Sequence, residues 1–174
     1  ANGIRELFIS RDGGSLYEKK NFRFDKKTGE YYFSERIDTR KLPDGPNVLW
    51  MKSLDMLGST GYAAFLFFVD NTPPQISIYH PDLSLPVHGN IRITGQIDDL
   101  VGVKSLKILL EKQEIPVEVR PGDPFWSAEV SLLDIRKTKT ALLFAAEDIA
   151  GNTSQIRYTL RLDREADLPK VSIS

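Results

Sequence analysis

The sequence lacks cysteine entirely, and it has neither a long apolar run nor an excess of one charge. Without cysteine there can be no disulfide, thiolate metal site or cysteine nucleophile. The longest apolar run, YAAFLFFV at 62–69, has eight residues, whereas a transmembrane helix needs roughly 18 or more. Lys and Arg number 23 against 24 Asp and Glu. We therefore expect neither membrane insertion nor a nucleic-acid partner.

Histidine is scarce as well. His80 and His88 are the only two, and both lie in the proline-rich stretch YHPDLSLPVHG (79–89) without an accompanying serine motif. A catalytic triad or a zinc site needs more converging groups than these. We expect the protein not to be an enzyme.

Alternation of apolar and polar residues dominates the second half of the chain. Its apolar positions form four series: Ile91, Ile93 and Ile97; Leu106, Ile108 and Leu110; Ile115, Val117 and Val119; and Trp126, Ala128, Val130 and Leu132. Period-two alternation is typical of half-buried strands. Short polar or Gly/Pro-rich connections separate the series, which together predict an antiparallel β-sandwich.

An internal repeat relates the two halves of the chain. LWMKSLDMLGST (49–60) aligns with LLFAAEDIAGNT (142–153), and the same offset of 93 residues places Phe33 opposite Trp126. Self-similarity at one constant offset indicates two copies of one structural unit. Phe33 and Trp126 are then expected in the two cores.

The first copy begins out of phase with the second. ELFIS (6–10) resembles SLKIL (105–109), so the first copy has no counterpart to residues 76–102, which supply about two strands. The predicted fold is all-β, with two tandem Ig-like antiparallel sandwiches of which the first lacks its N-terminal strands. The expected boundaries are a partial sandwich at 1–72, a complete one at 73–168, and a linker or third repeat beginning at 169–174. Prolines at both joints predict semi-rigid connections.

Three segments resemble the tandem bacterial Ig-like (Big-type) domains of large surface and secreted proteins. They are VHGNIRITGQIDDLVGV (87–103), AAEDIAGNTS (145–154) and VDNTPPQISI (69–78). The first copy departs from the pattern, with Ser59 where the family usually has Asn. The resemblance implies a cell-surface, secreted or periplasmic location and a binding or scaffolding role.

The turn sequence DIAGN (148–152) has a structural and a functional interpretation. In the first, Asp148 accepts backbone hydrogen bonds, Gly151 takes positive φ, and Asn152 tolerates a left-handed conformation, which together close a hairpin. In the second, a calcium ion is bound by oxygen ligands near a domain joint. Its candidate ligands are Asp98, Asp99, Asp148, Asp163 and Asp70.

Candidate interaction residues come from a difference between the copies. The last strand of the second copy has Arg157, Thr159 and Arg161 pointing outward, whereas the first copy has Ala64, Leu66 and Phe68. Such an apolar outer face predicts a cover supplied by a neighbouring domain, another chain or the missing strands. Phe65, by contrast, is expected to point inward, and Tyr32 and Phe125 are candidate exposed aromatics.

The combined expectation is a non-catalytic structural and binding segment of a bacterial surface or secreted multidomain protein. It would act as a semi-rigid spacer and as an adhesion or protein-interaction module. One alternative is an accessory carbohydrate-binding segment of a polysaccharide-active enzyme. Another is an assembly subunit completed by a strand from another segment or chain. The expected partners are neighbouring Ig-like domains, or a protein or polysaccharide of a host or cell surface.

Overall fold

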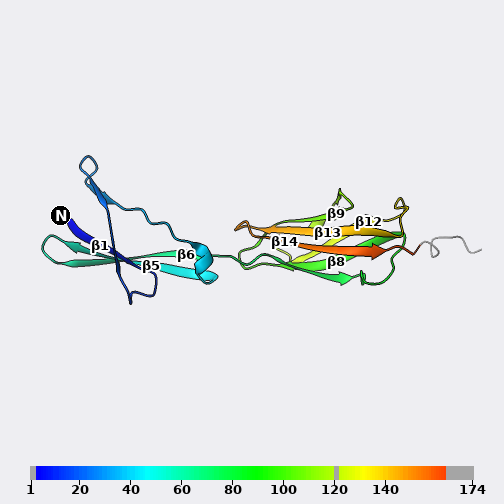
Figure 1. Cartoon of the computed structure of the whole chain (residues 1–174), viewed down its shortest axis with the longest axis horizontal. Helices are drawn as coiled ribbons and strands as arrows, with labels where there is room; N and C mark the ends of the chain where they lie inside the picture. Colours follow the sequence, from blue (N-terminus) through cyan, green and yellow to red (C-terminus); the bar gives the residue numbers. More distant parts are fainter. Residues whose placement is uncertain (1–2, 120–121, 164–174) are drawn as a thin grey trace, which may run out of the picture. The chain divides into compact units, whose positions relative to one another are not determined.

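The computed structural model of the protein describes residues 3–119 and 122–163 (Figure 1). The chain divides into two compact units, residues 1–71 and 72–174. Apart from one short 3-10 helix, the regular elements are strands, which confirms the all-β class. In the described part of the chain no helix is long and apolar enough to cross a membrane. The predicted third repeat at 169–174 lies outside the described residues.

The second unit is a two-sheet antiparallel sandwich. Its strands are β7 (Gln75–His80), β8 (Asn90–Asp98), β9 (Val103–Leu110), β10 (Gln113–Ile115), β11 (Glu118–Val119), β12 (Phe125–Ser131), β13 (Lys139–Asp148) and β14 (Thr153–Arg161). One sheet has the order β10-β9-β13-β14 and the other β11-β12-β8-β7. This is the arrangement of an Ig-like sandwich, in which strands A, B, E and D face strands C, F and G.

The core of the second unit lies between these two sheets. The ring of Phe144 on β13 lies 5.6 Å from that of Trp126 on β12 and 5.9 Å from that of Tyr158 on β14. Trp126 is only 3 % exposed, as predicted. It packs directly against Gly95 on β8, where an added Cβ would lie 2.4 Å from the indole Cζ2. Only glycine leaves room for the indole ring at this position.

The single strand predicted at 115–119 is wrong. β10 pairs with β9 in one sheet, whereas β11 pairs with β12 in the other. The chain therefore crosses between sheets at Pro116, whose missing N–H interrupts the ladder. Alternation continues through the crossing, so it could not reveal the change of sheet.

The first unit repeats one of the two sheets. Its elements are β1 (Ile4–Ser10), β2 (Glu18–Lys20), β3 (Arg23–Asp25), β4 (Glu30–Tyr32), the 3-10 helix η1 (Thr39–Lys41), β5 (Gly45–Asp55) and β6 (Thr60–Val69). The order β2-β1-β5-β6 corresponds to β10-β9-β13-β14, and β3 and β4 form a separate hairpin. Among residues 3–71 no strand corresponds to β7 or β8, which confirms that the first sandwich lacks its N-terminal strands.

The two sheets share their register as well as their strand order. Leu49 lies opposite Phe65 in the first, and Leu142 opposite Tyr158 in the second. Both sheets also carry a β-bulge where β1 meets the end of β5 and where β9 meets the end of β13. The offset found in the sequence thus describes equivalent positions in three dimensions.

Phe33 does not occupy a core position equivalent to that of Trp126. It is 36 % exposed, and the surrounding residues 33–38 are not in a strand. In the second unit, the equivalent β12 is held by pairing with β8. Because the first unit has no counterpart of β8, its segment has no partner strand and Phe33 is not enclosed.

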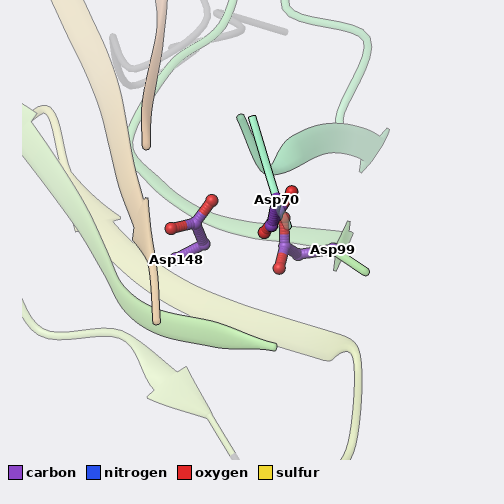
Figure 2. Close-up of side chains that lie close together, drawn as sticks. All are labelled: Asp70, Asp99 and Asp148. Carbon is purple, nitrogen blue, oxygen red and sulfur yellow. The ribbon is translucent and has the colours of Figure 1, made fainter. Parts of the chain in front are cut away.

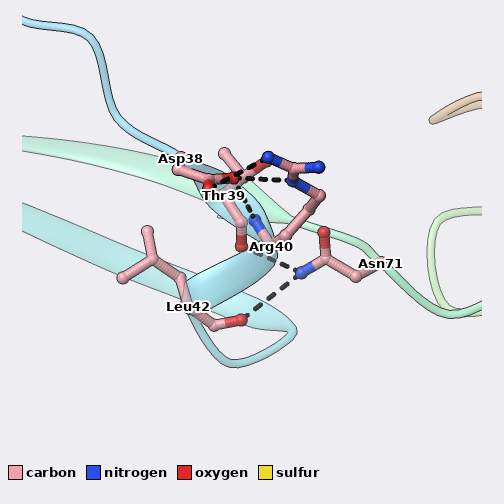
Figure 3. Close-up of polar contacts among 5 residues, drawn as sticks. All are labelled: Asp38, Thr39, Arg40, Leu42 and Asn71. Atoms are coloured by element: carbon pink, nitrogen blue, oxygen red, sulfur yellow. Dashed lines mark hydrogen bonds and ion pairs between the residues drawn. The ribbon is translucent and has the colours of Figure 1, made fainter.

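The last residue of the first unit is tied to η1 (Figure 3). The side-chain amide of Asn71 donates to the carbonyl oxygens of Thr39 at 3.0 Å and Leu42 at 3.3 Å. Its backbone N–H donates to the Asp44 carboxylate at 2.8 Å. Asp38 caps η1 and pairs with the Arg40 guanidinium at 2.8 Å. These contacts fix where the first unit ends.

Truncation of the central aromatic tests this description of the core. Phe144→Ala should lower the free energy of unfolding of the second unit by about 3–5 kcal/mol, because it leaves a cavity between the two sheets. Phe125→Ala, which truncates an exposed aromatic of the same unit, should change it by about 0.5 kcal/mol or less. Urea unfolding followed through amide signals of β13 measures both values. Similar losses for the two variants would contradict the assignment.

Candidate functional site

The turn between β13 and β14 is organised by a buried carboxylate. Asp148 is fully buried, and its two oxygens accept hydrogen bonds at 2.8 Å from the backbone N–H and the side-chain amide of Asn152. Gly151 has a φ of 95°, as predicted. Asn152 is not among the described residues with positive φ, so the predicted left-handed role is wrong. Its contribution is the two hydrogen bonds that it donates to Asp148.

The equivalent turn of the first unit is built in the same way. The Asp55 carboxylate accepts the N–H groups of Leu57 and Ser59, both at 2.8 Å, and Gly58 has a φ of 87°. Ser59 takes the place of Asn152. Its backbone N–H donates to the aspartate as that of Asn152 does, but it has no side-chain amide to donate a second hydrogen bond. Because both copies use this carboxylate to close a hairpin, the turn interpretation of DIAGN accounts for Asp148 without a ligand.

Two opposing effects act on the pKa of Asp148. Burial raises the pKa, but the hydrogen bonds from the side chain and backbone of Asn152, with smaller contributions from the N–H groups of Gly151 and Ala150, lower it. The net result is a pKa below the ordinary aspartate value of 3.8. The charged form is therefore the one that the fold stabilises.

Two of the five candidate calcium ligands come together within the second unit. The carboxylates of Asp99 and Asp148, labelled in Figure 2, have oxygens within 4.8 Å of one another. Asp70 follows β6, Asp99 follows β8 and Asp148 ends β13. One oxygen of Asp99 accepts the N–H groups of Val101 at 3.0 Å and Gly102 at 2.9 Å. Hard oxygen donors with this charge density are suited to calcium.

Asp70 belongs to the first unit, and the remaining two candidates lie outside the Asp99–Asp148 pair. Asp98 is exposed, and its carboxylate accepts a hydrogen bond from the Gln96 amide at 2.6 Å. Asp163 follows β14 and is also exposed, with its backbone N–H donating to the Val87 carbonyl at 2.9 Å. Of the neighbours Asp98 and Asp99, only the second lies beside Asp148.

The candidate interaction residues lie on the surfaces of their units. Ala64, Leu66 and Phe68 share the outer face of β6, where Leu66 is 59 % and Phe68 66 % exposed. Tyr32 and Phe125 are exposed as well. Within the chain's described residues, the apolar outer face thus has no cover.

Phe65 lies on the inner face of the sheet, as expected, but it is not buried. Its register places it on the same face of the sheet as Leu49, yet 59 % of it is exposed. The direction of the side chain was predicted correctly from alternation. Its burial was not, because burial needs a second sheet over that face.

Sequence reasoning also missed a cavity of about 290 Å³ in the first unit. Its lining includes Leu7, Met51 and Ala63 on one side and Phe22, Tyr31 and Phe33 on the other. One available signal was residue size, because Met51 and Ala63 stand where the second copy has Phe144 and Ile156. Smaller side chains at equivalent inward positions leave space.

The depressed pKa of Asp148 predicts a pH dependence. A carboxylate whose pKa is lower in the folded state stabilises the protein above its unfolded pKa, and this contribution is lost as the pH falls through the folded pKa. Asp148→Asn should therefore be less stable than the original chain at pH 7, and the difference should shrink between pH 5 and about pH 2. Urea unfolding of the second unit across that range measures it.

The exposed Asp134 provides the control. Asp134→Asn should match the original chain at every pH in this range. A difference for Asp148→Asn that stays constant down to about pH 2 would contradict the assigned role of the carboxylate charge.

Comparison with known proteins identifies similar folds only. No protein-family model and no curated protein matches the chain. Among solved structures, it resembles fibronectin(III)-like modules of Clostridium thermocellum CbhA, with 12 % identity over 99 % of this chain and 85 % of that one, at a TM-score of 0.45. It also resembles a Ca²⁺-stabilized adhesin with which an Antarctic bacterium binds ice, with 13 % identity over 93 % of this chain and 40 % of that one, at a TM-score of 0.42.

A third similar structure is a tetra-tandem repeat from the extending region of a large adhesion protein. The identity is 14 % over 93 % of this chain and 42 % of that one, at a TM-score of 0.42. The chain spans less than half the length of either adhesin structure. Likeness at this level assigns no function.

Proposed function

We propose that the chain is a non-catalytic structural and binding segment of a bacterial surface or secreted multidomain protein. It serves as a spacer built from Ig-like units, and it presents exposed apolar strands to protein partners. The observation that carries the proposal is the recurrence of one four-stranded sheet, with the same order, register and bulge, in both units. Serial copies of one unit are how proteins build extended arrays.

The outer face of β6 is the surface proposed for protein contact. Leu66 and Phe68 present contiguous apolar area, while the equivalent positions of the second unit carry Thr159 and Arg161. An exposed apolar patch of this kind is a feature of interaction sites. The last strand of the second unit has no such apolar face. We therefore assign partner binding to the first unit and the role of a spacer to the second.

A calcium ion at Asp99 and Asp148 is part of the proposal. Two carboxylates with oxygens within 4.8 Å of one another repel each other, and a divalent cation removes that repulsion. Carboxylates supply several of the six to eight oxygens that calcium takes, and backbone carbonyls and water complete its shell. Calcium sites in extracellular modules have dissociation constants of roughly 10⁻⁴–10⁻³ M, which suits a surface protein.

Thermal unfolding tests the calcium site. In 10 mM calcium the melting midpoint should rise by several degrees relative to EDTA, because a ligand at 10 to 100 times its dissociation constant adds about 1.4–2.7 kcal/mol. Asp99→Asn should abolish the rise while keeping an oxygen for the N–H groups of Val101 and Gly102. Asp98→Asn, the matched change one residue earlier, should retain it. An unchanged midpoint in the original chain would exclude the site.

Surface digestion tests the proposed location and role. In intact cells that make the parent protein, external protease should remove the epitope of an antibody raised against residues 72–163, because a surface segment is accessible from outside. A cytoplasmic marker protein, probed in the same samples, controls for lysis. An epitope that becomes sensitive only after the cells are broken would contradict the proposal.

A further inference from the structure

Within residues 3–71, the inner face of the sheet β2-β1-β5-β6 has no counterpart of β7 and β8 facing it. Paired residues share a face, so the apolar residues of this inner face are Leu7, Ile9, Leu49, Met51, Ala63, Phe65, Phe67 and Val69. Leu7, Ile9, Leu49 and Val69 are buried, but Met51 is only half-buried and Ala63 and Phe65 are exposed. The exposed part of the face therefore lies at Ala63 and Phe65, in the middle of β6.

The equivalent face of the second unit is covered by a strand pair. There β7 and β8 contribute Ile76, Ile93 and Ile97 to the core, all of them buried. Under that cover Phe144, the equivalent of Met51, has no exposed surface. The difference between the two units follows from the presence or absence of this pair.

The cavity of about 290 Å³ lies against this uncovered face. Met51 and Ala63 line it from the sheet, and Tyr31 and Phe33 line it from the opposite segment. It is about twice the size of the roughly 150 Å³ cavity that holds a benzene molecule. The space suffices for several apolar side chains, and its lining is predominantly apolar.

A backbone edge accompanies the cavity. Residues 33–38 correspond to 126–131 of β12, whose backbone pairs with β8 along its whole length. In the first unit the same segment lies outside any strand. The acceptor site thus has two parts, an apolar face to be covered and an extended segment to be paired.

We propose that the first unit is an acceptor for a β-strand pair of the β7–β8 type, supplied by a polypeptide segment outside residues 1–174. One strand of the pair hydrogen-bonds to residues 33–38, and alternate apolar side chains of the pair fill the cavity over Met51 and cover Phe65. This inference goes beyond the spacer role and stands independently of it. Completing a sheet with a supplied strand is β-augmentation.

The chemistry of the site selects this occupant. A backbone edge beside an apolar face is matched by a strand with alternating apolar residues, whereas a polysaccharide would leave the predominantly apolar cavity without complementary groups. The strand pair does not cover Leu66, because its equivalent Thr159 is exposed and lies on the face of β14 opposite to the buried Leu160. The two faces of β6 therefore have different partners.

A fusion tests the proposal on the whole chain. Gly3 and Gly102 hold equivalent places, since their carbonyls accept the N–H groups of Met56 at 3.0 Å and Ile149 at 2.9 Å. A second copy of residues 72–101 placed directly before Gly3 therefore enters β1 as the original enters β9. Amides of residues 33–38 and 63–67 should exchange with deuterium at least about tenfold more slowly in the fusion. The same fusion with the added copies of Ile76, Ile93 and Ile97 changed to serine should gain nothing.

Substitutions at two neighbouring residues distinguish the inner face of β6 from its outer face. Phe65→Lys and Leu66→Lys alter residues that are both 59 % exposed, so neither should unfold the chain. In the fusion, Phe65→Lys should abolish the added protection and Leu66→Lys should keep it. Equal behaviour of the two variants would overturn the assignment of the inner face.

If the fusion is insoluble, a peptide of residues 72–101 can be added to the unfused chain instead. The peptide should slow the same amides, and its serine version should not. Absence of protection with both fusion and peptide would overturn the proposal. It would also be overturned if the unfused chain proved to be a dimer in the ultracentrifuge that already protects residues 33–38 and 63–67, because a second copy would then be the cover.

Discussion

The structure depends on one constraint, that an apolar sheet face has to be covered by a second sheet. In the second unit β7, β8 and β12 provide the cover, and the close approach of Gly95 to Trp126 lets the two sheets meet over Phe144. In the first unit the same inner sheet is present without this cover. The exposed Phe65, the cavity and the absence of a strand at residues 33–38 all follow from that single difference.

The sequence repeat predicted the inner sheet well because its pairing is local to each copy. The strands β5 and β6 are joined by the Asp55 turn, and β13 and β14 by the Asp148 turn, so a constant offset carries the register with it. Burial could not be predicted in this way. It depends on strands far away in sequence, which is why Phe33 and Phe65 were assigned to a core that only the second copy completes.

The candidate site was predictable only in part for a similar reason. Five acidic residues near the joints were predicted as candidate calcium ligands. The sequence alone does not show which of their carboxylates lie close together in the fold. Asp98 still belongs to β8 and bonds to Gln96 on the same strand, whereas Asp99 begins the following turn and its carboxylate lies within 4.8 Å of that of Asp148. Asp148 has a sufficient structural role in its turn, and a bound calcium ion would add to that role without replacing it.

The two units share a sheet and differ in its cover. Residue-resolved hydrogen exchange of the 174-residue chain compares equivalent amides directly, because 49–53 and 63–67 correspond to 142–146 and 156–160. We expect clearly faster exchange throughout the segments of the first unit, where solvent reaches the inner face. Equal protection of the two sets of amides would contradict it, since a closed first sandwich would then exist without the missing strands.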